Sequence, residues 1–426
     1  MKLEQDVCNG SKRKQIYKCG WLWQTGYYAK TKQKGGRGMR EGWEYKKLGD
    51  VCQVVTGSTP KTNISEYWDG NYPWVTPAEL KGDVYISDTA RHITEEAIAH
   101  TNLTLLPIGT VLLSSRAPIG KVAITTIEMY CNQGFKNLIC SDAINNKYLY
   151  LWLSGKTEYL NSLGRGATFK EISKTIVENV IIPLPPLSIQ KSIVSELDKI
   201  NELIRLKKEQ LKDYDNLAQS IFYEMFGDPV VNEKGWEVKK LIETVVLECT
   251  ISYGIVQPGD GVEDGIPVVR PIDLTGTFVS TNNLKKTTEK ISSSYSRTIL
   301  TGKELLVCVR GTTGVCSLVT DELKGCNVTR GITPLLFNDN TDRWFMYYQF
   351  QMPQIKCIIA DYTKGITLKQ INMADFRKIP VILPPLPLQQ LFAQRIELIE
   401  KQKAEIQSTI ADLETLLASR MQYWFD

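Results

Sequence analysis

Histidine is scarce in the 426-residue sequence, which holds only His92 and His100, and none of its ten cysteines forms a Cys-x-x-Cys pair. Structural zinc sites and disulfide frameworks need closely spaced cysteines and histidines, so we expect neither, and the cysteines are predicted to be reduced and mostly buried. No stretch approaches the roughly 20 apolar residues of a membrane span, and the N-terminus lacks the apolar core of a signal peptide. These absences predict a cytoplasmic protein that does not enter a membrane.

Catalytic motifs are missing as well. The stretch from Ala117 to Val122 is like the end of a phosphate-binding loop, but Ser115 stands where that loop needs its first glycine and Val122 where it needs Ser or Thr. Two histidines only eight positions apart argue against a histidine-dependent mechanism that uses two sites. We therefore expect no turnover and no bound metal in this chain alone.

The charge is unevenly distributed along the chain. Residues 1–40 hold ten Lys/Arg and two Asp/Glu, whereas the remaining residues hold 41 and 45, so the body is slightly acidic although the whole chain carries +4. If the body binds nucleic acid, its positive charge must be gathered locally. The segment 1–41 has no counterpart elsewhere in the chain and is predicted to be a poorly ordered basic extension.

Two segments carry the apolar repeat of a coiled coil, with spacings that alternate between four and three residues. Each follows a proline-rich stretch, which ends a strand and favours a helix start. The seams are interrupted only by polar positions such as Lys207, and each ends in aromatic residues, Tyr223–Phe226 and Tyr423–Phe425. The main seam positions are Ile193, Leu197, Ile200, Ile204 and Leu211 in the first segment, and Ile396, Ile399, Ile406, Ile410 and Leu413 in the second. Each long helix is therefore predicted to have its partner in the same chain, and the aromatic ends to meet a globular domain or a partner.

The segments before the two helices are repeats of one another, which predicts one fold used twice. The matching blocks are 42–48 with 235–241, 72–82 with 266–276, 111–120 with 305–314, and 164–172 with 362–371. In the third block an apolar strand runs into a tight turn that begins with Arg116 or Arg310. Between the blocks the halves diverge: 57–62 has no close match in 252–258, and the residues after Asn132 and Asn327 differ. Different loops on a shared frame suggest two sites of the same kind that read different targets.

Over residues 42–426 the sequence resembles the specificity subunit of Type I restriction-modification enzymes. The resemblance rests on the order of several motifs, and most of them occur twice. They are Gly-Trp-x-x-Lys-Lys-Leu at 42–48 and 235–241, Thr-Gly-Ser-Thr-Pro at 56–60, Pro-Trp-Val at 73–75, the turn 116–120, Asn-Gln-Gly-Phe at 132–135, the segment 166–172, and the Pro-Pro-Leu-x-x-Gln helix entries that end at Gln190 and Gln389.

The resemblance implies an α+β fold with two similar target recognition domains of mixed β-sheets, joined by two long helices in an antiparallel coiled coil. The expected parts are an extension over 1–41, recognition domains over 42–186 and 228–385, and spacer helices over 187–227 and 386–426. Such a subunit is not an enzyme. It recognises a bipartite double-stranded DNA target and directs adenine methylation or cleavage by two methyltransferase and two motor-nuclease subunits, which would hold the S-adenosylmethionine, ATP and magnesium.

The second repeat departs from this pattern, because it has neither the Thr-Pro loop nor the Asn-Gln-Gly-Phe segment, so contact residues cannot simply be copied from the first. Base readout needs Arg or Lys for guanine and Asn or Gln for adenine, and phosphates are bound by cationic and hydroxyl side chains. The candidate DNA-binding residues of these types are Thr59, Lys61, Lys81, Arg116, Gln133, Arg165, Thr168 and Lys170 in the first repeat, and Tyr253, Gln257, Arg270, Arg310, Thr312, Arg330, Lys364, Thr367 and Lys369 in the second.

Two other functions fit the same residues. The chain is also compatible with a coiled-coil scaffold whose loops bind protein, and with the specificity subunit of a related system in which one partner polypeptide carries both methylation and cleavage. Binding to DNA through several phosphates weakens steeply as salt rises, which separates the DNA-binding functions from the scaffold.

Overall fold

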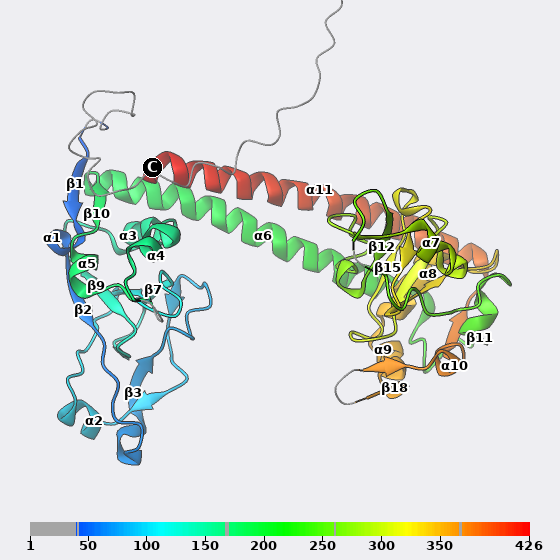
Figure 1. The fold of residues 1–426 in the computed structure, drawn as a ribbon, viewed down its shortest axis with the longest axis horizontal. Coiled ribbons are helices and arrows are strands. Elements are labelled where there is room, and N and C mark those ends of the chain that lie inside the picture. The colour runs from blue at the N-terminus through cyan, green and yellow to red at the C-terminus, as the bar shows by residue number, and fades with distance from the viewer. Residues whose placement is uncertain (1–39, 41, 167–169, 260, 366–368) are drawn as a thin grey trace, which may run out of the picture. The chain divides into compact units, whose positions relative to one another are not determined.

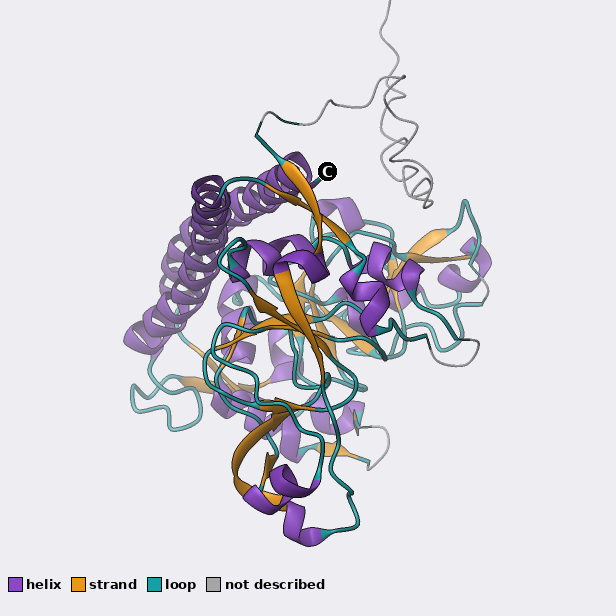
Figure 2. Ribbon diagram, turned by 90° about the vertical axis from the view of Figure 1, so that its left-hand side faces the viewer, coloured by secondary structure: helices purple, strands orange, loops and turns teal. Residues whose placement is uncertain are grey.

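The computed structural model describes residues 40, 42–166, 170–259, 261–365 and 369–426 (Figure 1). The chain divides into two compact units: unit 1 is Met1–Leu197 with Met421–Asp426, and unit 2 is Asp198–Arg420. Helices and strands are intermixed in both (Figure 2). None of the described helices combines the length and the apolar composition that crossing a bilayer requires.

Among its described residues, unit 1 contains three sheets and five short helices. The largest sheet has the order β2 (Cys52–Thr56), β9 (Lys136–Cys140), β6 (Val111–Leu113), β7 (Val122–Thr125) and β4 (Tyr85–Ile86). The others are β5 (His92–Ile93), β3 (Trp68–Val75) and β8 (Tyr130–Cys131), and the pair β1 (Glu44–Lys47) and β10 (Ile181–Leu184). The helices are α1 (Leu48–Val51), α2 (Glu95–His100), α3 (Asn146–Ser154), α4 (Thr157–Leu163) and α5 (Lys174–Glu178), with a 3₁₀ turn at Ser65–Tyr67.

Unit 2 repeats this plan with smaller sheets. Its sheets are β13 (Lys285–Thr287), β12 (Ile266–Val269) and β16 (Asn327–Val328); β15 (Cys316–Leu318), β14 (Leu305–Cys308) and β17 (Ile332–Leu335); β18 (Thr363–Lys364) and β19 (Gln370–Ile371); and β11 (Glu237–Lys240) and β20 (Pro380–Leu383). The helices are α7 (Glu289–Ser293), α8 (Arg343–Gln351), α9 (Pro353–Asp361) and α10 (Met373–Phe376). The 3₁₀ turns are Leu241–Thr244, Pro271–Asp273, Ser296–Thr298 and Asp321–Leu323.

The strand pairing confirms that one fold is used twice. Strands β1 and β10 pair antiparallel, and so do β11 and β20. Strand β3 is parallel to β8, as β12 is to β16, which makes the sheets mixed. The strand that ends before each arginine turn, β6 or β14, is antiparallel to the strand that follows the turn, β7 or β15.

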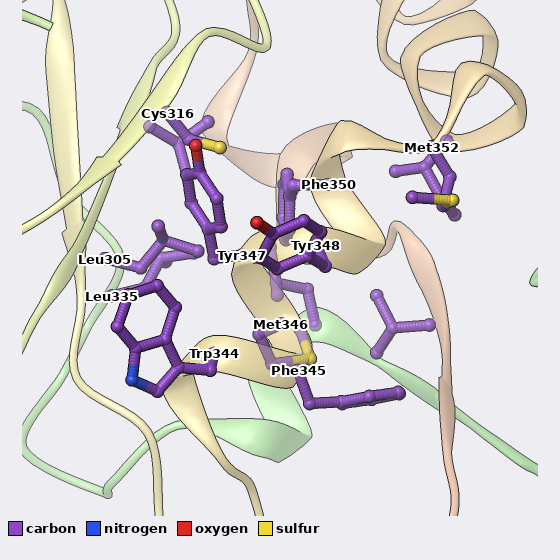
Figure 3. Packing of buried hydrophobic residues seen from close by; sticks show 14 of the residues in the cluster. Leu305, Cys316, Leu335, Trp344, Phe345, Met346, Tyr347, Tyr348, Phe350 and Met352 are labelled. Carbon is purple, nitrogen blue, oxygen red and sulfur yellow. The ribbon is translucent and has the colours of Figure 1, made fainter. Parts of the chain in front are cut away.

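The core of unit 2 is built around α8 (Figure 3). Phe345 is fully buried, and its ring lies 5.6 Å from the ring of Phe222 and 4.8 Å from that of Phe226, both on α6. Phe392 of α11 lies 5.4 Å from Phe226. In unit 1 the ring of Phe425, at the end of α11, lies 5.5 Å from that of Tyr148. The prediction that the aromatic helix ends meet globular domains is therefore confirmed.

Helices α6 (Leu187–Phe226) and α11 (Leu386–Phe425) form the predicted antiparallel pair. Within unit 2, Ile200 and Ile204 are buried against Ile406 and Ile410, and Leu211 and Leu413 pack beside them, partly buried. Lys208 pairs with Glu414 and Asp215 with Lys403, so residue numbers rise along one helix as they fall along the other. The remaining seam residues, Ile193, Leu197, Ile396 and Ile399, are also buried.

A buried glutamine fixes the start of each long helix. Gln190 Oε1 accepts a hydrogen bond from the amide of Asn145, the N-cap of α3, and its Nε2 donates to two backbone carbonyls, those of residues 143 and 185. Gln389 Oε1 accepts from the amide of Asp342, the N-cap of α8, and its Nε2 donates to the carbonyls of residues 340 and 384. The glutamine of the helix-entry motif thus has the same structural role in both repeats.

Candidate nucleic-acid interface

Hydrogen bonds between backbone groups gather four segments of unit 1 into one group of loops, which we call loop set 1. It consists of residues 57–61, 114–120, 132–134 and, from the last segment, 164–166 with 170–171. The amide of Ser58 donates to the carbonyl of Cys131 at 2.9 Å, and the amide of Ser115 donates to the carbonyl of Gly134 at 2.7 Å. Arg165 and Glu171 exchange two bonds of 3.0 Å across the base of the last segment. The two divergent loops, the arginine turn and the last segment therefore lie together.

Unit 2 has an equivalent group, loop set 2, made of residues 251–257, 309–314, 329–331 and, from the last segment, 363–365 with 369–371. The amide of Ile255 donates to the carbonyl of Val328 at 2.8 Å, and the amide of Val309 donates to the carbonyl of Gly331, also at 2.8 Å. Gly311 donates to Lys369 at 2.8 Å, which ties the arginine turn to the last segment. The first two contacts between segments thus recur in both sets with different side chains.

The turns that carry Arg116 and Arg310 have the same backbone shape. Ala117 and Gly311 both adopt positive φ, at 41° and 88°, and the turns close at Gly120 and Gly314 with φ of 95° and 88°. The last glycine donates its amide back to the end of the strand, to Ser114 in unit 1 and to Cys308 in unit 2. Positive φ strains residues with a Cβ, which explains why glycine occupies three of these four positions.

A shared glycine relates the segments 57–62 and 252–258, which show no close match in sequence. A Cβ on Gly57 would lie 2.0 Å from the carbonyl oxygen of Asn132, and a Cβ on Gly254 would lie 2.2 Å from that of Val328. Neither backbone can tolerate that approach. The two segments are therefore structurally equivalent, and a single glycine was too little signal to show it.

The structure corrects the matching of Asn132 with Asn327. Val75 pairs with Cys131 in the first repeat and Val269 with Val328 in the second, so Asn132 corresponds to Thr329. Asn327 is a fully buried structural residue: its Oδ1 accepts from Thr298 at 2.7 Å, and its Nδ2 donates to Ser292. With the register corrected, Gln133 corresponds to Arg330 and Gly134 to Gly331.

Most candidates of the first repeat lie in loop set 1. Thr59 Oγ1 donates a hydrogen bond to Gln133 Oε1. The Arg116 side chain lies beside Gly134, with its Nε 3.4 Å from where a Cβ of that glycine would be. Lys61, Arg165 and Lys170 are exposed, and Thr168 lies outside the described residues. Lys81 is exposed on the loop after β3, away from the segments that define the set.

The candidates of the second repeat gather in the same way. Tyr253 donates its hydroxyl to the carbonyl of Ile371 at 3.1 Å and accepts from Gln370 Nε2 at 2.9 Å. The guanidinium of Arg330 lies 5.8 Å from the centre of the Tyr253 ring. Arg310 is half-buried at the start of its turn, and the remaining members of the set, Gln257, Thr312, Lys364 and Lys369, are exposed. Thr367 lies outside the described residues.

Arg270 is held in a structural ion pair. Its Nε and Nη2 donate to the two carboxylate oxygens of Asp273 at 3.0 and 2.9 Å, and Asp273 is only 5% exposed. The hydrogen bond to this carboxylate raises the pKa of Arg270 further above its ordinary value. Glu79 accepts from the amide and hydroxyl of Thr76 in the corresponding turn of unit 1. The Arg270 guanidinium therefore stabilises this turn, and its predicted contact with DNA stays a prediction.

Lys136 is a residue of this region that the sequence did not reveal. It is 5% exposed, and its Nζ lies 3.1 Å from Glu171 Oε1 and 3.3 Å from Ser115 Oγ. It therefore fastens the arginine turn to the last segment of loop set 1. A lysine inside an apolar strand is ordinarily read as an exposed edge position, so only the tertiary contacts identify it.

Both loop sets are locally basic although the body of the chain is acidic. The only carboxylate in either set is Glu171, and it is paired with Lys136. The cations are Lys61, Arg116, Arg165 and Lys170 in loop set 1, and Arg310, Arg330, Lys364 and Lys369 in loop set 2. Cations interleaved with hydroxyl, amide and aromatic side chains suit a polyanion whose bases are also contacted.

Comparisons with known proteins agree with this arrangement. A family model described as the Type I restriction modification DNA specificity domain matches residues 40–213 and again 234–415. The Type I restriction enzyme MjaIX specificity subunit of Methanocaldococcus jannaschii is 32% identical over 389 residues, which cover 84% of this chain and 87% of that protein. The EcoBI specificity subunit of Escherichia coli is 23% identical over 60% of this chain and 59% of its own length.

The fold is also found among solved structures. A chain from a structural study of complex assembly and conformational transition in the type I R-M system superposes with a TM-score of 0.58. The match covers 91% of this chain and 98% of the other, at 21% sequence identity. At that identity the likeness establishes the shared fold and no more.

Proposed function

Because the chain belongs to the family of Type I restriction modification DNA specificity domains, with two copies of the domain, we propose that its two units each read one half of a bipartite DNA target. The chain is a specificity subunit: it selects the DNA target, and its partner subunits catalyse the reactions. Helices α6 and α11 each begin in one unit and end in the other. We propose that these helices set the length of the DNA gap between the two half-sites.

The observation that carries this proposal is the pair of loop sets. Each holds four cations on a shared backbone frame, and the side chains that differ between them are of types that read bases. A frame repeated in this way places equivalent contacts on two stretches of DNA. The differences between the sets then allow the two half-sites to have different sequences.

The chemistry is assigned to partners of this chain. Two methyltransferase subunits would bring S-adenosylmethionine and methylate adenine, and two motor-nuclease subunits would bring ATP and magnesium for cleavage. The relatives' names, which refer to Type I restriction enzymes, support an assembly of this kind. We infer that the methyltransferase subunits contact the outer faces of the long helices, where the exposed side chains of Leu203, Leu398 and Leu416 supply apolar surface.

The salt dependence of DNA binding tests this proposal against a protein-binding scaffold. The complex of this chain with its methyltransferase is titrated with duplex DNA, and the logarithm of the binding constant is plotted against that of the salt concentration. Each phosphate contact contributes about one unit to the slope. Replacing Lys364 and Lys369 together with Gln is expected to reduce the slope by about two. Lys324→Gln, an exposed lysine of unit 2 outside the loop set, serves as the control.

A steep slope that falls in the double variant supports phosphate contacts in loop set 2. Binding that does not respond to salt, or an equal effect from Lys324→Gln, would instead favour the scaffold. The related system, in which one partner polypeptide carries both methylation and cleavage, differs only in partner composition. Mass spectrometry of the purified complex determines that composition.

A further inference from the structure

We propose that Gln133 and Arg330 are equivalent base-reading residues that specify different base pairs, an A·T pair in the half-site read by unit 1 and a G·C pair in the half-site read by unit 2. The inference rests on the proposed function and deepens it, because it names one residue in each unit that makes the two half-sites differ.

The equivalence follows from backbone hydrogen bonds. The glycine after each residue accepts a bond from the amide just before the arginine of the turn: Ser115 donates to Gly134 at 2.7 Å, and Val309 donates to Gly331 at 2.8 Å. The carbonyls two residues before Gln133 and Arg330, those of Cys131 and Val328, also accept hydrogen bonds. Their donors are the amides of Ser58 and Ile255, each of which directly follows the close-packed glycine of its segment, so both sides of the loop are fixed. Gln133 and Arg330 therefore occupy equivalent positions in the two loop sets.

Gln133 is exposed, and its amide is oriented by a neighbour. Thr59 Oγ1 donates to Gln133 Oε1, which leaves that oxygen a second lone pair and leaves Nε2 with two donors. An amide held in this orientation can accept a hydrogen bond from adenine N6 and donate one to adenine N7 at the same time. Thr59 is thus a positioning residue, and Gln133 supplies both halves of a bidentate contact.

Arg330 is oriented by an aromatic ring. Its guanidinium lies 5.8 Å from the centre of the Tyr253 ring, and the Tyr253 hydroxyl is held by Ile371 and Gln370. Among the described residues, Arg330 has no carboxylate partner, in contrast to Arg270 with Asp273. A planar cation held by its face keeps its edge donors available, and that edge matches guanine O6 and N7.

Two other roles are consistent with an exposed side chain at this place. A phosphate contact would strengthen binding to all sequences equally, and a purely structural contact would stabilise the loop without affecting the choice of base. Base readout alone predicts that a substitution exchanges one base pair at one position of one half-site. The experiment is therefore designed around base identity rather than total activity.

The methylated motif is determined by long-read methylation sequencing of a methylation-free host that expresses this full chain with its cognate methyltransferase subunit. We expect Gln133→Arg to change one A·T pair of one half-site to G·C, and Arg330→Gln to change one G·C pair of the other half-site to A·T. The preference at that position should change by at least about tenfold, the range that one bidentate contact provides. Arg330→Lys should keep the G·C pair.

Matched variants control for the change in charge. Gln53→Arg adds the same charge at an exposed site of β2, and Arg297→Gln removes one at an exposed site of unit 2. Both should leave the motif unchanged. If Gln133→Arg and Arg330→Gln also leave every base unchanged, or weaken methylation equally at all sites, the inference is overturned.

A second measurement does not depend on the folding of a variant. The wild-type complex is titrated with target duplexes in which 7-deazaguanine, which lacks N7, replaces one guanine at a time. In the half-site whose sequence Arg330→Gln changes, replacing one particular guanine should lower the affinity by about tenfold. If no replaced guanine in either half-site lowers the affinity, the assignment is contradicted. If the wild type itself methylates no split motif, the proposed function fails, whereas an unchanged motif in the variants rejects only this inference.

Discussion

Gln190 and Gln389 show how one residue type can serve the same structural purpose in both repeats. Each side chain is fully buried and bonds to three backbone groups, and these bonds join the start of a long helix to the N-cap of a shorter helix in the same unit. Neither glutamine faces solvent or DNA. The glutamine of the entry motif is therefore explained by folding, whereas Gln133 of loop set 1 is proposed to bind DNA.

Removing Gln389 is expected to destabilise unit 2. The change Gln389→Ala leaves the amide of Asp342 and the carbonyls of residues 340 and 384 without their buried partners, and each such loss costs about 1–3 kcal/mol. Allowing for water that enters the space, we expect the free energy of unfolding to fall by about 2–4 kcal/mol. Denaturant unfolding of the full chain measures the change, and the exposed Gln402→Ala should shift it by less than about 0.5 kcal/mol. A shift equal to that of the control would contradict the buried role.

At the residue scale, residue type and turn position predicted a good part of the candidate site. Arg116 and Arg310 begin equivalent turns, and the cations of the last segment of each repeat lie beside those turns. Two side chains show what the sequence could not reveal. Arg270 is held by Asp273 and Asn327 is buried against Ser292, and sequence shows which side chains are available but not which of them the fold has already engaged.

At the scale of the elements, Lys403 interrupts the apolar seam of α11 without breaking it. Its Nζ lies 2.8 Å from Asp215 of α6 and 2.7 Å from Glu400 of its own helix, and Tyr348 of α8 donates its hydroxyl to the same Glu400. Burial alone would lower the pKa of Lys403, but the hydrogen bonds to Asp215 and Glu400 outweigh it and the pKa is raised. The lysine thus joins the helix pair to the globular core.

We expect Lys403→Met to destabilise the chain, because Glu400 is only 11% exposed and would lose its charged partner. Breaking a buried pair on one side costs about 3–5 kcal/mol, and at this partly exposed site we expect about 2 kcal/mol. The double change Lys403→Met with Glu400→Gln should restore part of that loss. Thermal unfolding measures both, with exposed Lys401→Met as the control.

The raised pKa also fixes the sign of a pH effect. The stabilisation by Lys403 is fully present below the unfolded lysine pKa of about 10.4 and is lost as the pH rises through the higher folded pKa. The difference in melting temperature between the wild type and Lys403→Met should therefore shrink above that pH. Burial also raises the pKa values of the Tyr347 and Tyr348 hydroxyls, which are present in both proteins. A difference that grows with pH would contradict the assignment.

The long helices also make a prediction about spacing. One added heptad in each helix, between Ile204 and Leu211 in α6 and between Ile406 and Leu413 in α11, keeps the seam in register and lengthens the pair by ~10.5 Å. That is about 3 bp of duplex at ~3.4 Å per step. We expect the half-sites to remain and the gap in the methylated motif to grow. An unchanged gap with intact methylation would reject a role of the helices in spacing.

Among the elements, the two long helices were predictable and most of the strands were not. The apolar seam runs over many turns of both α6 and α11, and prolines precede each helix, so the sequence predicted both helices. By contrast, β4 has two residues and β18 has two, too few to show an alternating pattern. Their positions depend on pairing with strands far along the chain, so only the repeat of the whole block, not the strand itself, was visible in the sequence.

At the scale of the whole molecule, the internal repeat explains the overall logic of the chain. One α+β frame occurs twice, each copy presents a basic loop set, and the loops rather than the frame differ. Two frames with different loops suit a target made of two different half-sites. The same architecture explains the acidic body: positive charge is needed only where DNA is contacted.

The most direct test of this account is the methylation pattern produced by the wild-type chain with its cognate methyltransferase subunit in a host without other DNA methylation. Long-read sequencing should reveal one split motif, with two short and different half-sites, a fixed gap, and one methylated adenine on each strand. A continuous motif, or no motif from a complex shown to be soluble and associated, would contradict the central claim that the two units read two separated half-sites.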